Sequence, residues 1–588
     1  METGIGLEAS RSGPPAAAGA QRPARTRPFA LPGWLTVEIG LLGGVLCLAA
    51  GLRFLGLGDG VLAAEESRRA FTAWQIVRGE PASLEQGPAL LFPAALLLFL
   101  IGANDTVARL LPALAGTFVV AWPYLVRRQL GRGAALVACL SLAVSPSLVF
   151  ASRTLAGETV ALALLLLATL GWLRYREGRG PVWLAVAGAS AGLTLAAGPA
   201  AFALAVPVGV VVAASVAPAR GRVADLVPAG DVWRRGGTYG AAAAILLATG
   251  LLSRPDGLQT GIVDAAAAWV GSLLAGEPVR PAYHYVAGLA VYEPAALCLA
   301  LAGLITARRG RRCAAFLLAW AGVALLVYSL GVAKESSRLA LVAFPLALAA
   351  GRGAVDAWEA FGKRLDAAGV GLFLASALPA VGLWGTIATN VATPGTALSP
   401  ALLAVPPALF GLVAAYWVRW QGARKTFSYV ACLVALLLLG AQLRAGLGLV
   451  FAQETRPEEL LAGGKYTQDV RNLLREIEAH AAIFSTPGRR DIAVLVDERL
   501  KDPLAWYLRD YSRVTYGATA DSPLAVVAMP DREPPAGSYG YKQYTWAVHT
   551  HPALDAPGRL WLWLVYRDSG SPVVRESVRL YVALKINN

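Results

Sequence analysis

The chain has 588 residues, of which 56% are hydrophobic and only 15% are charged, and its mean hydropathy is +0.54. Because a soluble globular protein averages roughly a quarter charged residues, this composition excludes an ordinary water-soluble domain. The net charge of +14 comes mostly from arginines in short segments between apolar runs, without a basic patch interleaved with aromatic residues, so nucleic acid is not an expected partner. The apolar runs are continuous and lack the alternation of barrel strands, which predicts an all-α polytopic membrane protein.

The N-terminal segment is rich in alanine, proline, glycine and arginine, and we predict that residues 1–30 form a disordered cytoplasmic tail. Arg22, Arg25 and Arg27 place this tail on the inner side of the membrane by the positive-inside rule. The apolar run at 34–54 has no convincing small-residue cleavage site, so we predict an uncleaved first span.

The following segment, "VLAAEESRRAFTAWQIVRGE" (61–80), predicts a short amphipathic helix in the plane of the membrane interface. Its apolar face has helical spacing and consists of Leu62, Phe71, Trp74 and Val77. The adjacent Glu65 and Glu66 then have two interpretations. Either they lie on a solvated face, with a Glu65–Arg69 pair four residues apart, or they point into a water-accessible cavity.

The apolar segment 87–103 decides the topology. If it crosses the membrane, the basic loops at 127–132, 174–180 and 308–312 fall outside, against the positive-inside rule. If it lies along or dips into the outer face, the basic loops fall inside. We therefore predict a transmembrane domain over 31–451 with a cytoplasmic N-terminus and an outer C-terminus. The predicted spans, about thirteen in number by length and hydropathy, are 34–54, 106–126, 133–151, 154–173, 182–197, 200–217, 237–252, 285–306, 312–331, 339–351, 367–389, 400–418 and 427–450.

In this topology, charged residues fall at two outer turns. Arg153 and Glu158 lie at the turn of a predicted helical hairpin. Because a carboxylate within a span costs at least about 2.5 kcal/mol on insertion scales, Glu158 is expected to face an interior cavity, or else to reach the interface from the helix end. Lys334 and Arg338 lie between two spans, where cations suit a lipid-linked phosphate. A charged cap on a short loop is the alternative interpretation of these two.

The stretch "PAYHYVAGLAVYEP" adds three candidates for a substrate cavity. His284 and Tyr285 open a predicted span, and Glu293 lies about two turns deeper. A lone interfacial histidine more often packs than binds a ligand, whereas a carboxylate within a span favours a functional role.

From residue 452 onward the composition becomes mixed polar. The segments "TQDVRNLLREIEAHAA" and "PLAWYLRDY" predict helices, and "DIAVLVD", "RVTYG" and "PLAVVAM" predict strands. This alternation indicates a small extracytoplasmic α/β domain over 452–588.

Taken together, these segments resemble the GT-C class of membrane glycosyltransferases, and within it the protein-mannosyltransferase-like glycosyltransferase family 39. A bacterial and archaeal subgroup associated by name with flippase activity matches best. The resemblance covers about residues 55–350. It rests on "GANDTVARLLPALAG", "LGRGAALVACLSLAVSPSLVFASR", "YHYVAGLAVYE" and "YSLGVAK". In the first outer loop, "AEES" (64–67) aligns with a His-Asp-Glu-Ala stretch of the subgroup, and "QGP" (86–88) with a His-Gly-Pro.

The resemblance implies transfer of a sugar from a polyprenyl-phosphate donor to a protein, lipid or glycan acceptor, with inversion, at the outer face of a bacterial inner membrane. It assigns Glu65 as the general base, which takes the proton from the acceptor hydroxyl. Glu66 and Glu158 would position the acceptor or a divalent cation such as Mg²⁺ or Mn²⁺. The donor phosphate would be bound by three cations, Lys334, Arg338 and Arg153.

Three departures from the subgroup's pattern leave a second hypothesis open. The family's first-loop aspartate is Glu65, its two histidines are Ala64 and Gln86, and the arginine expected before Glu158 is Ala156. A longer acid can disturb a tuned catalytic geometry. The alternative function is that of a non-catalytic, flippase-associated or transport protein for lipid-linked glycans.

Overall fold

The computed structural model describes residues 37–216, 230–275, 280–306, 311–360, 362, 365–392, 402, 404–451, 459–461, 465–484, 490–517, 524–532, 535, 539–549, 563 and 572–583. The predicted tail at 1–30 lies outside the described residues.

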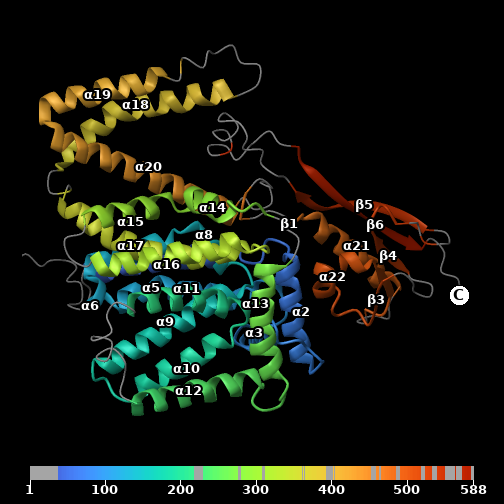
Figure 1. The fold of residues 1–588 in the computed structure, drawn as a ribbon. Coiled ribbons are helices and arrows are strands. Elements are labelled where there is room, and N and C mark those ends of the chain that lie inside the picture. Colours follow the sequence, from blue (N-terminus) through green and yellow to red (C-terminus); the bar gives the residue numbers. More distant parts are fainter. Residues whose placement is uncertain are drawn as a thin grey trace, which may run out of the picture.

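Most of the chain forms a bundle of helices, and the C-terminal region lies at one end of this bundle (Figure 1). The helices are α1 (Val37–Phe54), α2 (Ala64–Arg78), α3 (Pro88–Ile101), α4 (Asp105–Ala108), α5 (Leu110–Leu125), α6 (Arg127–Leu130), α7 (Arg132–Ala143), α8 (Pro146–Ser152), α9 (Gly157–Arg176), α10 (Val182–Leu195), α11 (Pro199–Val216), α12 (Gly230–Ala248), α13 (Ala265–Leu274), α14 (His284–Tyr292), α15 (Pro294–Thr306), α16 (Arg311–Leu330), α17 (Leu339–Ala360), α18 (Ala367–Ala392), α19 (Val405–Gln421) and α20 (Ala423–Phe451). Two short turns, η2 (Gln259–Asp264) and η3 (Ser336–Arg338), precede α13 and α17.

The chain is a multi-pass membrane protein. Within the described ranges, six helices are long and apolar enough to cross a membrane, or up to nine if each of three bent helix pairs counts as one span. Each of the thirteen predicted spans falls on a helix or a bent pair, but the count differs for physical reasons. Helices α5 and α19 have only 16 and 17 residues, α12 carries Asp231, Arg234 and Arg235, and α10 and α11 join as one bent pair. The described residues therefore give six to nine candidate crossings, and the thirteen spans stay a prediction.

The segment that decides the topology forms the short helix α3. Its 14 residues extend about 21 Å at 1.5 Å per residue, which is less than the roughly 30 Å of a hydrocarbon core. Helix α3 packs against α2. That 87–103 lies along or dips into the outer face without crossing stays a prediction, with which this short length is compatible.

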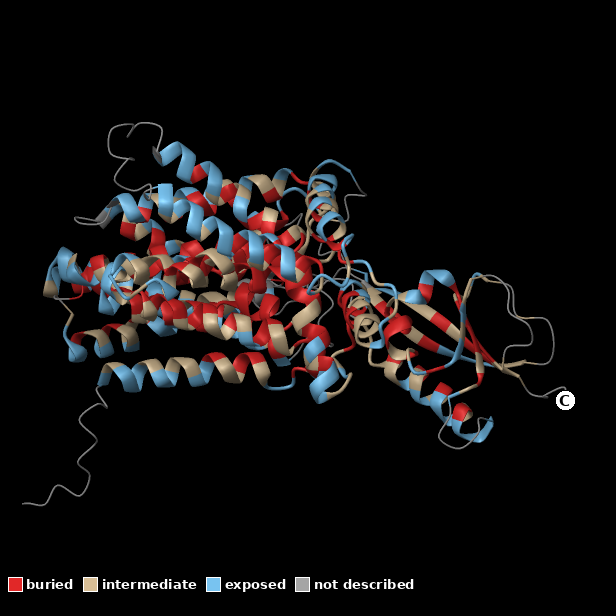
Figure 2. Cartoon of the chain, turned by 90° about the horizontal axis from the view of Figure 1, so that it is seen from below, coloured by how far each residue is buried: buried red, intermediate tan, exposed pale blue. Residues whose placement is uncertain are grey.

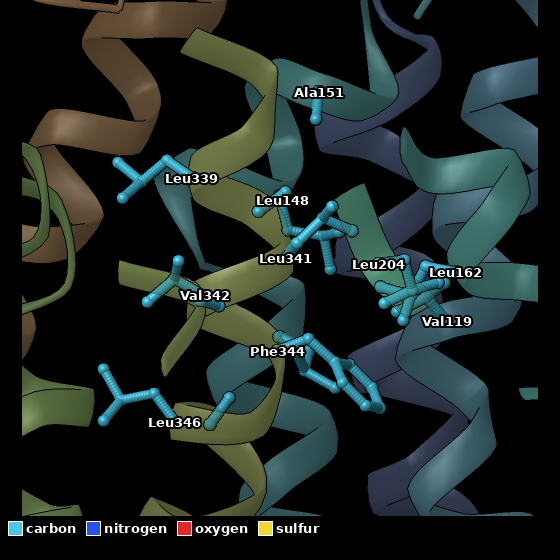
Figure 3. Close-up of a cluster of buried hydrophobic side chains, with 14 of the residues drawn as sticks. Val119, Leu148, Ala151, Leu162, Leu204, Leu339, Leu341, Val342, Phe344 and Leu346 are labelled. Atoms are coloured by element: carbon cyan, nitrogen blue, oxygen red, sulfur yellow. The ribbon is translucent and has the colours of Figure 1, made fainter. Parts of the chain in front are cut away.

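Helix α17 is the centre of the bundle. In its apolar window, 83% of the residues are buried, compared with 17% in α1 and in α18. Figure 3 shows α17 side chains, among them Leu341 and Phe344, facing residues of α5, α8, α9 and α11. The Phe344 ring contacts the rings of Trp122 and Trp320, with centroids 6.0 and 5.8 Å apart. Buried residues accordingly gather in the middle of the bundle (Figure 2), while large apolar side chains such as Ile305 are exposed on its surface, as expected for contact with lipid.

Three breaks in the helices create polar positions inside the bundle. The axis bends by 61° between α7 and α8, by 115° between α10 and α11, and by 89° between α14 and α15. Pro146, Pro199 and Pro294 start the second helix of each pair, where a proline is tolerated. At the second break, Gly87 and Gly198 approach so closely, both with positive φ, that a Cβ on either would collide with the other's backbone. This contact fixes Gln86 beside the start of α11.

The C-terminal region is a mixed α/β unit, as predicted. Its strands form one sheet in the order β1-β5-β6-β4-β2-β3, in which β2 pairs in parallel with β3 and β4 and the other pairs are antiparallel. The strands are β1 (Lys465–Tyr466), β2 (Ala493–Val496), β3 (Arg513–Tyr516), β4 (Ala525–Ala528), β5 (Tyr539–His549) and β6 (Val574–Ala583), and the helices are α21 (Asp469–Phe484) and α22 (Lys501–Tyr507). Both predicted helices and all three predicted strands are present.

The C-terminal region docks onto the end of the bundle through α22. This helix packs on α2, and the carboxylate of Asp105 accepts hydrogen bonds from Trp506 Nε1 (2.8 Å) and the Tyr507 hydroxyl (2.9 Å). Arg471 Nη2 lies 3.2 Å from the same carboxylate. Trp506 is fully buried at this junction. Helix α2 therefore packs against α3 of the bundle and against α22 of the C-terminal region.

Candidate functional site

Helix α2 runs across the end of the bundle, beside the docked C-terminal region (Figure 1). Its first turn is capped by Glu66, whose Oε2 accepts a hydrogen bond from the backbone N–H of Ala63 (3.1 Å). The helix ends at Gly79, whose positive φ of 71° suits a glycine. The helix predicted for this segment is thus present, and one side of it is buried at Ser67, Ala70 and Ala73.

Glu66 forms a buried ion pair with Arg109. Arg109 Nε and Nη2 donate to the two carboxylate oxygens at 3.0 and 2.9 Å, and the backbone N–H of Leu155 donates at 2.8 Å. Burial alone raises the pKa of Glu66, but Arg109 and these amides outweigh it and lower the pKa, so the carboxylate stays ionised. Arg109 also binds the carbonyls of Leu57 and Gly60. Glu66 thus ties α2 to the start of α5 and to the preceding loop.

A cavity of about 190 Å³ lies beneath the other side of α2. Its lining combines charged groups with small residues. It is lined by Glu65, Arg68, Arg69, Glu85, Gln86, Gly157, Glu158, Ala197, Pro199, Ala200, Ala268, Ser272, Glu335 and Arg338. The walls therefore come from α2, the loop before α3, the starts of α9 and α11, α13, and the turn before α17.

Glu65 is one of the more open acidic groups of this cavity. About half of its side chain is exposed, and its carboxylate lies 3.1 Å from Arg68 Nη1. Arg68 also donates to Asp502 of the C-terminal region, with Nη2 2.9 Å from Oδ2. The Glu65 carboxylate is therefore in contact with solvent, next to the point where the C-terminal region meets α2.

Two arginines lie deeper in the cavity. Arg69 donates to Gln86 Oε1 and to the Leu155 carbonyl, each at 3.0 Å, and its Nη2 lies 3.9 Å from Glu335 Oε2. Arg338 Nη2 lies 3.2 Å from Ser272 Oγ and 3.5 Å from Glu335 Oε1. Both guanidinium groups are thus directed at one place in the cavity, which a phosphate group could occupy.

Glu158 is a buried member of the same cavity. Its side chain is only 3% exposed at the start of α9, and it interacts with Glu335, Arg69 and Arg338. Gly157 beside it lies close to Ala200 of α11. The prediction that Glu158 faces an interior cavity rather than the interface agrees with this position.

The structure brings Glu65, Glu158 and Arg338 together but separates several other candidates from them. Arg153 donates to four carbonyls at the end of α1, those of Leu52, Arg53, Leu55 and Gly56. Its guanidinium group satisfies the helix end and does not line the cavity, which corrects the expectation that it lies with the phosphate ligands. Lys334 also lies outside the lining, with its Nζ on the Gly331 carbonyl at 2.7 Å.

His284 and Tyr285 lie behind the cavity. The Tyr285 hydroxyl donates to the Glu335 carbonyl at 2.8 Å, and its ring contacts that of Tyr328 with centroids 5.9 Å apart. His284 is buried, packs edge-on against Tyr285 and lies near Arg280 and Lys334. These residues support the turn that carries Glu335 and Arg338, and neither is part of the lining.

Glu293 belongs to a different polar cluster. Its Oε1 accepts hydrogen bonds from Ser145 Oγ (2.6 Å) and the Ser147 N–H (3.1 Å), and its Oε2 accepts one from Gln442 Nε2 (3.0 Å). The side chain therefore joins the break between α14 and α15 to the break between α7 and α8. Glu293 is buried as predicted, but in the interior of the bundle rather than in the substrate cavity.

Sequence reasoning did not assign Arg69 and Glu335 to the site. Arg69 directly follows Arg68, and its position four residues after Glu65 suggested a surface pair instead. Glu335 lies between the two cations Lys334 and Arg338 in the sequence. That charged triplet on an outer turn was the available signal.

Among the described residues, no three histidine, cysteine, aspartate or glutamate side chains gather closely enough to hold a metal ion. The divalent cation stays a prediction.

Comparisons with known proteins match segments of this chain. The family model "Dolichyl-phosphate-mannose-protein mannosyltransferase" matches residues 85–228, which include Gln86 and Glu158. Protein O-mannosyl-transferase 1 of Danio rerio is 42% identical over 88 residues, a stretch that covers 14% of this chain and 12% of that protein. The chain thus spans only a small part of this relative's length.

Two solved structures share the fold. They are ArnT from Cupriavidus metallidurans bound to undecaprenyl phosphate and the same protein in the apo state. Each has a TM-score of 0.51 and 16% identity, over 84% of this chain and 93% or 94% of ArnT. At this identity the likeness concerns the fold. The chain therefore has an ArnT-like fold, and a segment of it matches the mannosyltransferase family model.

Proposed function

We propose that the chain is a membrane glycosyltransferase that moves a sugar from a polyprenyl-phosphate donor to an acceptor hydroxyl. The observation that carries the proposal is one cavity that combines open and buried carboxylates with two inward-directed arginines, at the end of a bundle of ArnT-like fold. Such a cavity offers both groups that the reaction needs, a base for the acceptor and cations for the leaving phosphate. The family model matched by residues 85–228 supports the same reaction class.

In the proposed reaction, Glu65 is the general base. Its exposed carboxylate takes the proton from the acceptor hydroxyl as the acceptor oxygen attacks the anomeric carbon of the donor sugar. The bond between that carbon and the phosphate oxygen breaks, and the phosphate leaves with the electron pair and with inversion at carbon. Arg69 and Arg338 bind the departing phosphate, and Glu158 orients the acceptor from below. Glu66 keeps α2 in place through Arg109.

The proposal includes an orientation. The cavity and the C-terminal region lie on the outer side of a bacterial inner membrane, and the N-terminus lies in the cytoplasm. The basic loops predict this arrangement through the positive-inside rule. Cysteine labelling in intact cells tests it: a cysteine introduced at the half-exposed Glu80 should react with a membrane-impermeant maleimide. A cysteine at Arg128, in a basic loop, should react only after the cells are opened.

A second candidate is a protein that binds lipid-linked glycans without transferring the sugar. One observation favours it: the Glu65 carboxylate pairs with Arg68, which is itself bound to Asp502. In the transferase this pair must open when an acceptor arrives, whereas in a binding protein it stays closed.

A sugar-transfer assay of the purified full-length protein, in detergent or nanodiscs, distinguishes the transferase from the binding protein. A panel of polyprenyl-phosphate sugars is assayed with wild type, Glu65→Gln and, as a control for charge loss outside the cavity, Glu80→Gln. The transferase predicts a loss of at least about a hundredfold for Glu65→Gln and little change for Glu80→Gln. Equal turnover in all three removes Glu65 as the base. Donor binding without turnover in wild type supports the second candidate.

A further inference from the structure

Two guanidinium groups share one carboxylate in the cavity. Arg69 Nη2 faces Glu335 Oε2 at 3.9 Å, and Arg338 Nη2 faces Glu335 Oε1 at 3.5 Å. Each oxygen of Glu335 therefore has its own arginine. This is also the arrangement in which two oxygens of a phosphate group would be bound.

Both arginines are held in place without Glu335. Arg69 is fixed by Gln86 and by the Leu155 carbonyl, each at 3.0 Å. Arg338 is fixed by Ser272 Oγ at 3.2 Å and by the Ala333 carbonyl at 3.4 Å. Removing the Glu335 carboxylate would leave both guanidinium groups directed into the cavity. Loss of the Glu335 charge should therefore strengthen anion binding, because Glu335 competes with an incoming anion more than it positions the arginines.

The Glu335 side chain is held loosely by the two arginines, and it also makes a side-chain hydrogen bond with Glu158. Its backbone is anchored, because its carbonyl accepts hydrogen bonds from the Tyr285 hydroxyl and the Arg338 N–H, and the turn is pinned to α13 where the Ala333 N–H donates to the Ser272 carbonyl at 2.9 Å. The side chain itself is 39% exposed. Its contacts of 3.5 and 3.9 Å are long compared with the 2.9 Å pair of Glu66 and Arg109. Movement of this one side chain would open the site.

We propose that Glu335 is an internal stand-in for phosphate, which occupies the anion site of Arg69 and Arg338 until a phosphate group displaces it. The identity of that group as a polyprenyl phosphate rests on the proposed function. The displaced carboxylate moves toward the open part of the cavity, and no covalent bond changes. The stand-in keeps the two arginines paired in the empty cavity and makes donor binding weaker than the two arginines alone would make it.

The test is a binding measurement on the purified full chain, without sugar transfer. Affinities for undecaprenyl phosphate and for inorganic phosphate are measured for wild type and for Glu335→Gln, which keeps the shape and removes the charge. Glu80→Gln is the matched control, since Glu80 loses the same charge after the end of α2 and outside the cavity. Two more variants are Arg338→Gln and the double variant Glu335→Gln/Arg338→Gln. With wild type and Glu335→Gln they form a double-mutant cycle, which measures the coupling between the two residues.

We expect Glu335→Gln to bind undecaprenyl phosphate about tenfold more tightly, as expected when a competing charged contact is lost. Glu80→Gln should differ from wild type by less than about twofold. In the Arg338→Gln background, the gain from Glu335→Gln should shrink. The same gain with inorganic phosphate assigns the site to the phosphate group itself, and a gain with the lipid alone assigns it to a lipid-linked phosphate.

Unchanged or weaker binding by Glu335→Gln overturns the inference, because Glu335 would then position the arginines. If this variant does not fold, as judged by thermal unfolding, Glu335→Asn provides the same loss of charge and the same criterion. The proposed function fails separately, through absence of sugar transfer by wild type, and unchanged binding in Glu335→Gln leaves that function intact.

Discussion

The first turn of α2 contains two neighbouring glutamates in opposite environments. Glu66 is buried with Arg109, with side-chain exposures of 6% and 9%, and receives two arginine nitrogens and two backbone amides. Glu65 is half exposed and has one arginine, which is half exposed as well. One position further along a helix is a rotation of about 100°, so adjacent residues face different surroundings.

This contrast divides the molecule into a fixed part and an exchangeable part. A buried, bidentate pair with every oxygen satisfied holds elements together, and breaking it is costly. An exposed or loosely held pair contributes little to stability, so its members can exchange partners. The Glu66–Arg109 pair is of the first kind, and the Glu65–Arg68 and Glu335–arginine pairs are of the second. A structural role for Glu66 and the proposed chemical role of Glu65 thus fall on neighbouring residues of one helix.

The largest expected effect comes from breaking the fixed pair. Glu66→Ala leaves Arg109 buried without its partner and should lower the free energy of unfolding by about 3–5 kcal/mol. Glu65→Ala, one residue away, should lower it by less than about 1 kcal/mol. Thermal or denaturant unfolding of the two purified variants measures both values. Equal stabilities would remove the division between fixed and exchangeable pairs.

The next effect concerns the exchangeable arginines. Arg69→Gln should weaken undecaprenyl phosphate binding roughly tenfold to a hundredfold, because a charged contact with the anion is lost. Lys334→Gln is the comparison variant, since Lys334 lies outside the cavity lining, and it should change binding by less than about threefold. Isothermal titration in nanodiscs distinguishes them. A larger loss for the lysine variant would move the phosphate site to that side of the turn.

The junction with the C-terminal region also contains one well-bonded and one exposed carboxylate, and we expect smaller stability differences there. Asp105 is bound by Trp506, Tyr507 and Arg471, so Asp105→Asn should destabilise the docked state by about 1–3 kcal/mol. Asp502→Asn loses only the contact with the exposed Arg68 and should cost less than about 1 kcal/mol. The rate of limited proteolysis of the C-terminal region measures how often it undocks. Faster cleavage of the Asp502 variant than of the Asp105 variant would contradict this order.

The smallest effect is a pH dependence at Glu335. Burial raises the pKa of Glu335, but Arg338 and Arg69 outweigh it, and the pKa lies below its ordinary value. A carboxyl with a depressed pKa stabilises the fold above the unfolded-state value of about 4.3, and this contribution is lost as pH falls through the folded-state value. The charged and titratable groups that face Glu335 are Arg69, Glu158, Arg280, Tyr285 and Arg338. The melting temperatures of wild type and Glu335→Gln should therefore converge below about pH 4, and a constant difference between pH 7 and pH 3 would contradict the assignment.

The fold class and the C-terminal helices α21 and α22 with strands β2, β3 and β4 were predictable because they depend on local patterns, whereas β1, β5 and β6 were not predicted. Long apolar runs, the amphipathic segment around Glu65 and the alternating strands after residue 490 all have signals within a few residues. The breaks at Pro146 and Pro294 had a signal as well, since proline ends a helix before it. Reading 133–151 and 285–306 as continuous spans missed both breaks.

The site was predictable only in part, because its contacts join distant parts of the chain. Glu65, Glu158 and Arg338 could be placed on one side of the membrane by topology alone. The pairing of Glu66 with Arg109, 43 residues away, has no local signal, and neither does the capture of Arg153 by the end of α1. Charge and position along the chain predicted an outer turn for Arg153, but not that its donors are occupied by the end of α1.

A structure of the protein with undecaprenyl phosphate bound, determined by electron cryomicroscopy in nanodiscs, tests the central claim most directly. The account predicts the phosphate within hydrogen-bonding distance of Arg69 and Arg338, with the Glu335 side chain turned away and the Glu66–Arg109 pair unchanged. A phosphate bound at Arg153 or Lys334, with Glu335 still between the two arginines, would contradict it.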